Sequence, residues 1–155
     1  MKLSDLQEDL VGTWAGTKHL WMGPPPAAAQ TSDSRLEVSA AAKGKFLSLS
    51  YSWSFEGEGQ EGLMILGNNN PAEEATAAWI DSFHMSGKVM YCRGTVGDDG
   101  KASVLGSYEA PPGPDWGWRI TLQAQPSGGL LLEMYNITPD GDEALAVRGE
   151  YRRSA

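Results

Sequence analysis

The sequence predicts an all-β protein, an antiparallel up-and-down β-barrel of about ten strands with a short N-terminal helix. Three observations lead to this fold class. The 155 residues include 19 glycines and 9 prolines, which imply many turns. Short runs of alternating apolar and polar residues recur along the chain, and turn-forming residues separate each run from the next. The length fits one domain that spans residues 1–155.

The first element that we expect is a helix over Leu3–Leu10. Ser4 is a good N-cap residue, and Gln7 follows it at the spacing of a capping box. The three leucines of the segment fall on one helical face. This face is expected to lie across one end of the core.

The clearest strand is Phe46–Phe55, where leucines and aromatic residues alternate with four serines. This alternation predicts a strand with one buried face and one polar face. Further strands are expected at the start of the chain around Trp14, near Arg35–Ala40, and at Gly62–Leu66, Ala75–Phe83, Val89–Val96, Ser103–Tyr108, Trp116–Gln125, Leu130–Ile137 and Ala144–Arg153.

The order of these strands favours a closed arrangement. Consecutive hairpins without a long crossover indicate an up-and-down meander, and closure into a barrel removes the exposed edges of such a sheet. A two-sheet sandwich is the alternative architecture.

The charge of the chain argues against two classes of partner. Twenty acidic and twelve basic residues give a formal net charge of −8. Nucleic acids and anionic membranes are bound chiefly through lysine and arginine, so neither is expected as a partner.

The sequence also bears on the compartment. Cys92 is the single cysteine and has no internal disulfide partner. The N-terminus lacks the features of a signal peptide, and no apolar run is long enough for a spanning helix. A cytoplasmic protein is the expectation.

The residues that could hold a metal or act as a nucleophile are few and scattered. His19 and His84 are the two histidines, and they form no short cluster with Cys92, so no metal site is expected. Asp81, Ser82 and His84 include the residue types of a catalytic triad. On a strand, however, Ser82 and His84 share one face while Asp81 points to the other, so these three cannot converge.

Asp81 and Arg93 flank the Ser86-Gly87 turn and form a second candidate pair. A two-residue turn places Asp81 opposite Cys92, and one more residue places it opposite Arg93. If both point inward, they form a buried pair that can orient a polar ligand group. If both point outward, they form a surface pair, which is the orientation we favour.

The aromatic residues give the main indication of a binding function. Six tryptophans exceed what a core of aliphatic residues needs, and several lie on predicted strands. They either line a cavity or fill the barrel. The candidate ligand-binding residues are Tyr51, Trp53, Met64, Trp79, Asp81, Tyr91, Arg93, Trp118 and Met134.

Four short motifs, distributed over nearly the whole chain, resemble the bacterial domain-of-unknown-function family 1579. None of them is catalytic. They are Gly12-Thr13-Trp14, Trp79-Ile80-Asp81-Ser82-Phe83-His84, Gly94-Thr95 and Gly149-Glu150-Tyr151-Arg152-Arg153. That family is similar to the calycins, which include the lipocalin, fatty-acid-binding and nitrobindin-like barrels.

The resemblance implies a meandering barrel around a cavity for a small, mostly apolar ligand. It also implies that Trp14 packs against Arg152 or Arg153 from the last strand, in a cation–π contact. Nitrobindin-like relatives bind haem through a histidine late in the chain. Here no histidine follows His84, so no haem or other cofactor is expected.

The leading hypothesis is therefore a protein that binds a small apolar or aromatic molecule inside a β-barrel. One alternative is an isomerase or cyclase in which Asp81, His84, Tyr91 or Arg93 moves protons. Another is a structural or interaction protein with a filled barrel, in the form of a homodimer that associates through a strand face. The enzyme hypothesis is less favoured than binding.

Overall fold

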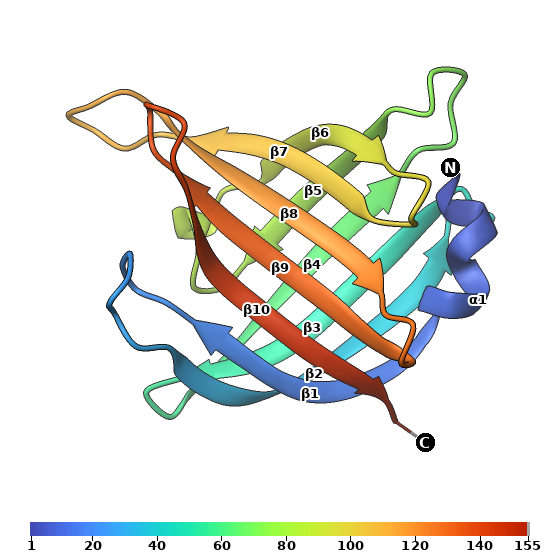
Figure 1. Cartoon of the computed structure of the whole chain (residues 1–155), viewed down its shortest axis with the longest axis horizontal. Helices are drawn as coiled ribbons and strands as arrows, with labels where there is room; N and C mark the ends of the chain where they lie inside the picture. The colour runs from blue at the N-terminus through green and yellow to red at the C-terminus, as the bar shows by residue number, and fades with distance from the viewer. Residues whose placement is uncertain (155) are drawn as a thin grey trace.

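Residues 1–154, which the computed structural model describes, form a closed antiparallel barrel of ten strands. Each strand pairs with its neighbours in the sequence, and β1 also pairs with β10, which closes the sheet (Figure 1). The predicted fold class is confirmed. The strands are β1 Gly12–Leu20, β2 Gln30–Ala41, β3 Phe46–Phe55, β4 Glu58–Gly67, β5 Ala75–Asp81, β6 Met90–Val96, β7 Ala102–Tyr108, β8 Trp116–Ala124, β9 Gly129–Ile137 and β10 Glu143–Arg153.

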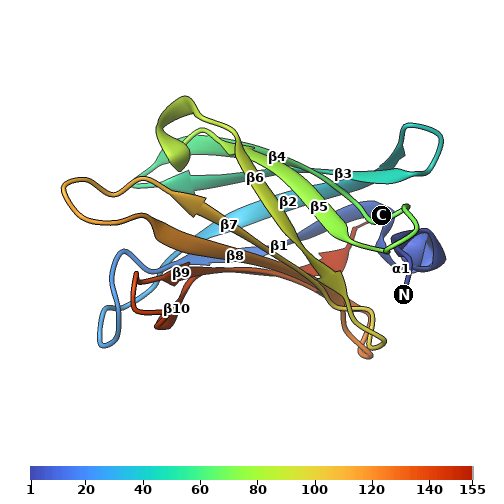
Figure 2. The same cartoon turned by 90° about the horizontal axis from the view of Figure 1, so that it is seen from above.

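The two ends of the barrel differ. At one end lie the 3₁₀-helix η1 Leu3–Leu6 and the short helix α1 Gln7–Leu10, whose residues Leu3 and Leu10 are buried. Figure 2 shows this helical segment at one end of the barrel and the β7–β8 loop projecting from the other. No helix within residues 1–154 is long and apolar enough to cross a membrane.

The helical segment begins differently from the sequence prediction. Lys2 precedes the first turn, and no side chain caps it, so the Ser4 and Gln7 capping box does not form. The Gln7 side chain instead donates a hydrogen bond to the Gly44 carbonyl in the β2–β3 turn, at 2.8 Å. Gln7 thus fastens the helical segment to the barrel.

The interior changes character along the barrel axis. Toward the helical end the inward positions carry mainly aliphatic side chains, such as Val38, Leu47 and Leu49, which are almost fully buried. Toward the open end they carry aromatic and charged side chains, among them Lys18 and Asp81. A charged group inside a barrel needs partners, so the open end is where function is sought.

Trp14 and Arg153 hold the helical end together. The Trp14 indole is buried and donates to the Leu10 carbonyl at 3.0 Å. The Arg153 guanidinium lies 4.5 Å from the centre of the Trp14 ring and donates to the Val11, Glu8 and Asp9 carbonyls at 2.8–2.9 Å. The expected cation–π contact is confirmed, with Arg153 as the partner.

We expect Arg153→Met to lower the free energy of unfolding by about 1–3 kcal/mol, because it removes the cation–π contact and three hydrogen bonds to carbonyls. Urea unfolding measures the change. Arg152→Met is the matched control, since Arg152 lies on the same strand and donates a hydrogen bond to the Ser127 carbonyl at 3.1 Å. Equal stability of the two variants would contradict the role assigned to Arg153.

Candidate ligand-binding site at the open end of the barrel

Three polar side chains from three strands point into the barrel near its open end. Lys18 comes from β1, Tyr51 from β3 and Asp81 from β5. Their exposed fractions are 3%, 5% and 6%. Each occupies an inward position because the side chains of a strand alternate between its two faces.

The Asp81 carboxylate accepts hydrogen bonds at both oxygens. Tyr51 Oη donates to Oδ2 at 2.6 Å, and the backbone N–H groups of Phe83 and His84 donate to Oδ1 at 2.8 and 3.1 Å. Trp79 Nε1 donates to Tyr51 Oη at 2.9 Å. These bonds end β5 at Asp81 and turn the chain back across the barrel mouth.

Gly62 makes the contact between Tyr51 and Asp81 possible. The three residues lie in one row across β3, β4 and β5, with Gly62 in the middle. A Cβ atom at Gly62 would overlap the Tyr51 hydroxyl and ring. The Tyr51 side chain therefore lies across the bare backbone of Gly62 to reach the carboxylate two strands away.

Lys18 is held by aromatic faces. Its Nζ lies 3.3 Å from the centre of the Trp53 ring and 5.4 Å from that of Tyr51. Burial lowers the pKa of Lys18 from 10.5 to about 7, although the negative charge of Asp81 acts in the opposite direction. The Lys18 amine therefore lies in a mainly aromatic environment.

His84 lies in a cluster of tryptophans. Its ring is stacked on Trp53 at 6.0 Å between centroids, and it lies 5.6 Å from Trp79 and 5.5 Å from Trp118. Burial lowers the pKa of His84 from 6.5 to about 4; Asp81 opposes this shift and Lys18 adds to it. The imidazole is therefore neutral near pH 7.

The segment after His84 adopts an unusual backbone conformation. Met85, Ser86 and Gly87 form a short 3₁₀ turn, η2, with φ angles of 66°, 50° and 78°. The left-handed region suits glycine but costs other residues about 1–2 kcal/mol each. Met85 and Ser86 thus hold His84 in the barrel mouth at an energetic cost.

Several buried nitrogens around His84 lack partners. Within residues 1–154, Trp53 Nε1, Trp118 Nε1 and His84 Nε2 are buried without a hydrogen bond. An unmade bond of this kind costs about 1–3 kcal/mol. Three such groups in one cluster mark this end of the barrel as a candidate binding site.

A cavity of about 370 Å³ adjoins this cluster at the barrel mouth. Trp79 and Trp118 form one wall, with ring centroids 5.7 Å apart and planes 8° from parallel. Tyr108 packs edge-on against Trp118 at 6.4 Å. The remaining lining residues are His84, Met85, Ser86, Lys88, Met90 and Glu109.

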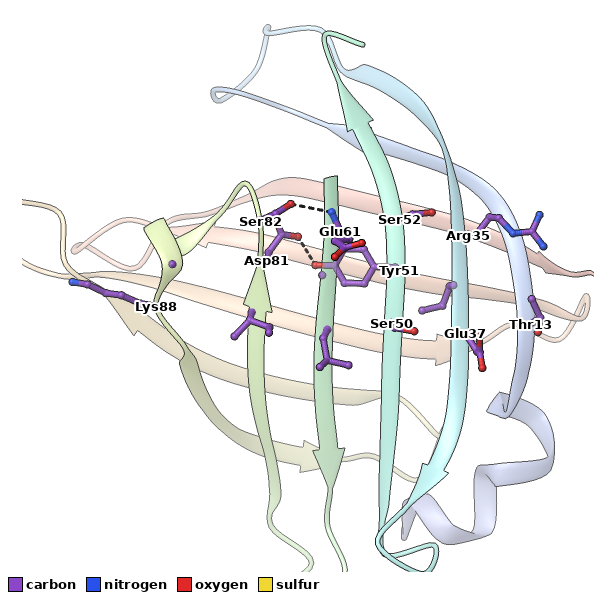
Figure 3. Close-up of a pocket in the computed structure, with 15 residues that line it drawn as sticks. Thr13, Arg35, Glu37, Ser50, Tyr51, Ser52, Glu61, Asp81, Ser82 and Lys88 are labelled. Carbon is purple, nitrogen blue, oxygen red and sulfur yellow. Dashed lines mark hydrogen bonds between the residues drawn. The ribbon is translucent and has the colours of Figure 1, made fainter. Parts of the chain in front are cut away.

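A larger hollow of about 720 Å³ is associated with the wall of β1–β5 (Figure 3). Tyr51 and Asp81 belong to the inner face of this wall, whereas Arg35, Glu37 and Ser52 occupy the alternate positions that point outward. Side chains on opposite faces of a sheet do not enclose one common space. The candidate site is therefore the smaller cavity.

Five of the predicted ligand-binding residues come together at this end of the barrel, where they touch one another or line the cavity. They are Tyr51, Trp53, Trp79, Asp81 and Trp118. Met64 and Met134 also point inward, but both are fully buried in the core and neither lines the cavity.

Two expectations about strand faces need correction. Asp81 points into the barrel, whereas we favoured an outward position. Tyr91 is 58% exposed on the outer face, because Met90 and Cys92 take the inward positions of β6. Arg93 points outward, as we favoured, and lies 3.4 Å from the Glu74 carboxylate, so it does not line the cavity.

The register of this hairpin explains the error. The connection between β5 and β6 runs over residues 82–89 and includes η2, so it is much longer than the expected turn. Cys92 is opposite Ala77 and Arg93 opposite Thr76, which leaves Asp81 beyond the paired region of β6. Asp81 and Arg93 therefore form no pair.

Sequence reasoning missed Lys18 and Gly62. Lys18 is four residues after Trp14 on the same strand, and this spacing assigns both to the inner face. That signal was available, but lysine is so seldom buried that its identity argues against such a position. Nothing in the sequence near Gly62 indicates that a tyrosine must pass over it.

The site offers limited options for metals and proton transfer. Within residues 1–154, no three His, Cys, Asp or Glu side chains are grouped as a metal site requires. Of the four residues in the isomerase hypothesis, Asp81 and His84 are at the barrel mouth, and Tyr91 and Arg93 are on the outer surface.

Comparisons with known proteins extend over nearly the whole chain. Residues 5–153 match the family model described as protein of unknown function DUF1579. The crystal structure of Rv2717c from M. tuberculosis is similar in fold, with a TM-score of 0.63 and 15% identity over 97% of each chain. None of the curated proteins compared with the chain matches it.

We expect Gly62→Ala to destabilise the protein by about 2–4 kcal/mol, because the new methyl group displaces the Tyr51 hydroxyl from Asp81. Thermal and urea unfolding measure the loss. Gly59→Ala is the control on the same strand, since nothing lies within 4 Å of a Cβ atom there. If both variants unfold alike, the row of Tyr51, Gly62 and Asp81 is not under steric constraint.

A second expectation concerns pH. Between the folded pKa of Lys18, about 7, and its usual value of 10.5, the unfolded chain binds one proton more than the folded protein does. Stability relative to Lys18→Met should therefore rise with pH above 7, at up to about 1.4 kcal/mol per unit. The measurement is urea unfolding of both proteins from pH 6 to 9.5. A constant difference would mean that the pKa of Lys18 is not lowered.

Proposed function

The chain belongs to the DUF1579 family, and we propose that it binds a small, largely apolar molecule in the open end of its β-barrel. The observation that carries this proposal is the cavity of about 370 Å³ beside Trp79 and Trp118. Its volume lies in the range of about 300–1,000 Å³ that is common for small-molecule sites.

The lining suits a flat aromatic compound. The nearly parallel rings of Trp79 and Trp118 provide a broad apolar surface, and Tyr108 adds an aromatic edge. Met90 is unbranched and adapts its shape to different ligands. Lys88 and Glu109 belong to the polar part of the lining.

The resemblance to the calycins supports the same proposal, since those barrels hold small apolar ligands. A cofactor is not part of it. The enzyme alternative is weaker than binding, because both Asp81 oxygens already accept hydrogen bonds and two of its other residues face outward. We also propose a cytoplasmic location, which the single buried cysteine, Cys92, supports.

The test is calorimetric titration with 2-naphthylmethanol, a neutral probe of suitable size. We expect binding that Trp118→Leu weakens about tenfold, through the loss of one aromatic wall. Tyr91→Ala is the control, because it removes an exposed aromatic residue from the outer face of β6. No binding at millimolar probe, or equal loss in both variants, would refute the proposal.

A further inference from the structure

We propose that the ligand carries a carboxylate, as in a planar aromatic acid, and that this group binds to Lys18 and to the indole N–H groups of Trp53 and Trp118. In this complex the ligand takes the place of the His84 imidazole. The inference rests on the proposed function, because it assigns the chemical class of the ligand for the same site.

The site has an excess of hydrogen-bond donors. Lys18, Trp53 and Trp118 are at most 7% exposed. Within residues 1–154 the indole nitrogens of Trp53 and Trp118 have no hydrogen-bond acceptor, and the Lys18 amine lies 3.3 Å from the centre of the Trp53 ring. An ammonium group and an indole N–H can donate but cannot accept. The missing partner must therefore be an acceptor.

The carboxylate that the protein places in this region is already engaged. Asp81 is the buried carboxylate of this region, and both of its oxygens already accept hydrogen bonds from Tyr51 and the 83–84 backbone. A ligand carboxylate would bring two oxygens with several lone pairs. It would also bring a negative charge into direct contact with the Lys18 ammonium.

The three donor groups lie close to His84 and to one another. The rings of Trp53 and Trp118 both lie within 6.0 Å of the His84 ring, and the Lys18 amine lies on Trp53. The two indole nitrogens are buried, so a ligand reaches them only if a side chain leaves. Trp53, Trp118 and Lys18 are fixed on strands, whereas His84 is on the connection between β5 and β6.

His84 also has the properties of a group that can leave. It is neutral, its Nε2 is unpartnered, and Met85 and Ser86 beside it occupy left-handed backbone conformations. Departure of its ring would expose the face of Trp53, on which it now stacks with the planes 21° apart, and free the space beside Trp118. That shape favours a planar aromatic acid over a flexible aliphatic chain.

A coupling to protons follows from the surroundings of Lys18. The groups that face it are Tyr51 and Trp53 from β3, Asp81 from β5, and His84 from the 82–89 connection. Burial already lowers the pKa of Lys18, so part of the population is neutral above pH 7. A bound carboxylate stabilises the ammonium, and binding should take up a proton.

The experiment compares 2-naphthoate with neutral 2-naphthylmethanol by calorimetry at pH 8, in buffers of different ionisation enthalpy. We expect naphthoate to bind at least about tenfold more tightly, with proton uptake. Lys18→Met should remove both the preference for naphthoate and the proton uptake, whereas the alcohol should still bind. His84→Ala should strengthen naphthoate binding severalfold, because no side chain has to be displaced.

Two controls keep the result interpretable. Lys88→Met removes the lysine that lines the cavity of about 370 Å³ and should leave the preference for naphthoate intact. Trp118→Phe keeps an aromatic wall but lacks the N–H donor, so it should reduce the preference even if Lys18→Met fails to fold. In NMR spectra, naphthoate should shift the indole N–H signals of Trp53 and Trp118 downfield.

The outcomes separate the two proposals. If the acid and the alcohol bind equally, or if Lys88→Met rather than Lys18→Met removes the preference, the assignment of the carboxylate site is wrong and the proposed function stands. If neither compound binds to the protein or to His84→Ala, both proposals fail. Tighter binding of naphthoate that depends on Lys18 and Trp118 supports both.

Discussion

The organisation of the barrel mouth depends on one buried carboxylate. Asp81 accepts one hydrogen bond from the Tyr51 hydroxyl on β3 and two from backbone N–H groups of the connection that follows β5. It thereby fixes the Tyr51 ring in the wall, ends β5, and directs the chain so that His84 enters the tryptophan cluster. Since a buried carboxylate is stable only with its partners in place, the wall and the mouth are energetically linked.

The fold was predictable because barrel strands leave a strong local signal. The alternation of Phe46–Phe55 and the glycine-rich or proline-rich turns indicate strand positions without knowledge of the partner strands. The register of β5 and β6 was not predictable in the same way. Ser86-Gly87 suggested a tight turn, but the bonds from Asp81 to Phe83 and His84 lengthen the connection, and those bonds become visible only in three dimensions.

The candidate site, too, was predictable only in part. Strand parity and aromatic character were enough to identify Trp53, Trp79 and Trp118, because large apolar residues rarely face solvent in a row. Lys18 was not predicted as a site residue, because the groups that surround it come from other strands. They are an aromatic face and a buried carboxylate. Average residue preferences place a lysine on the protein surface, whereas residues of functional sites often depart from these preferences.

Contacts of the last strand bear on the order in which the protein assembles during synthesis. Arg153 binds carbonyl groups that precede it by 142 to 145 residues, and β10 is the strand that closes the sheet against β1. A ribosome must therefore release nearly the whole domain before these contacts can form. Until then β1 and β9 keep free edges, and these edges are where the incomplete barrel is open to pairing with other chains.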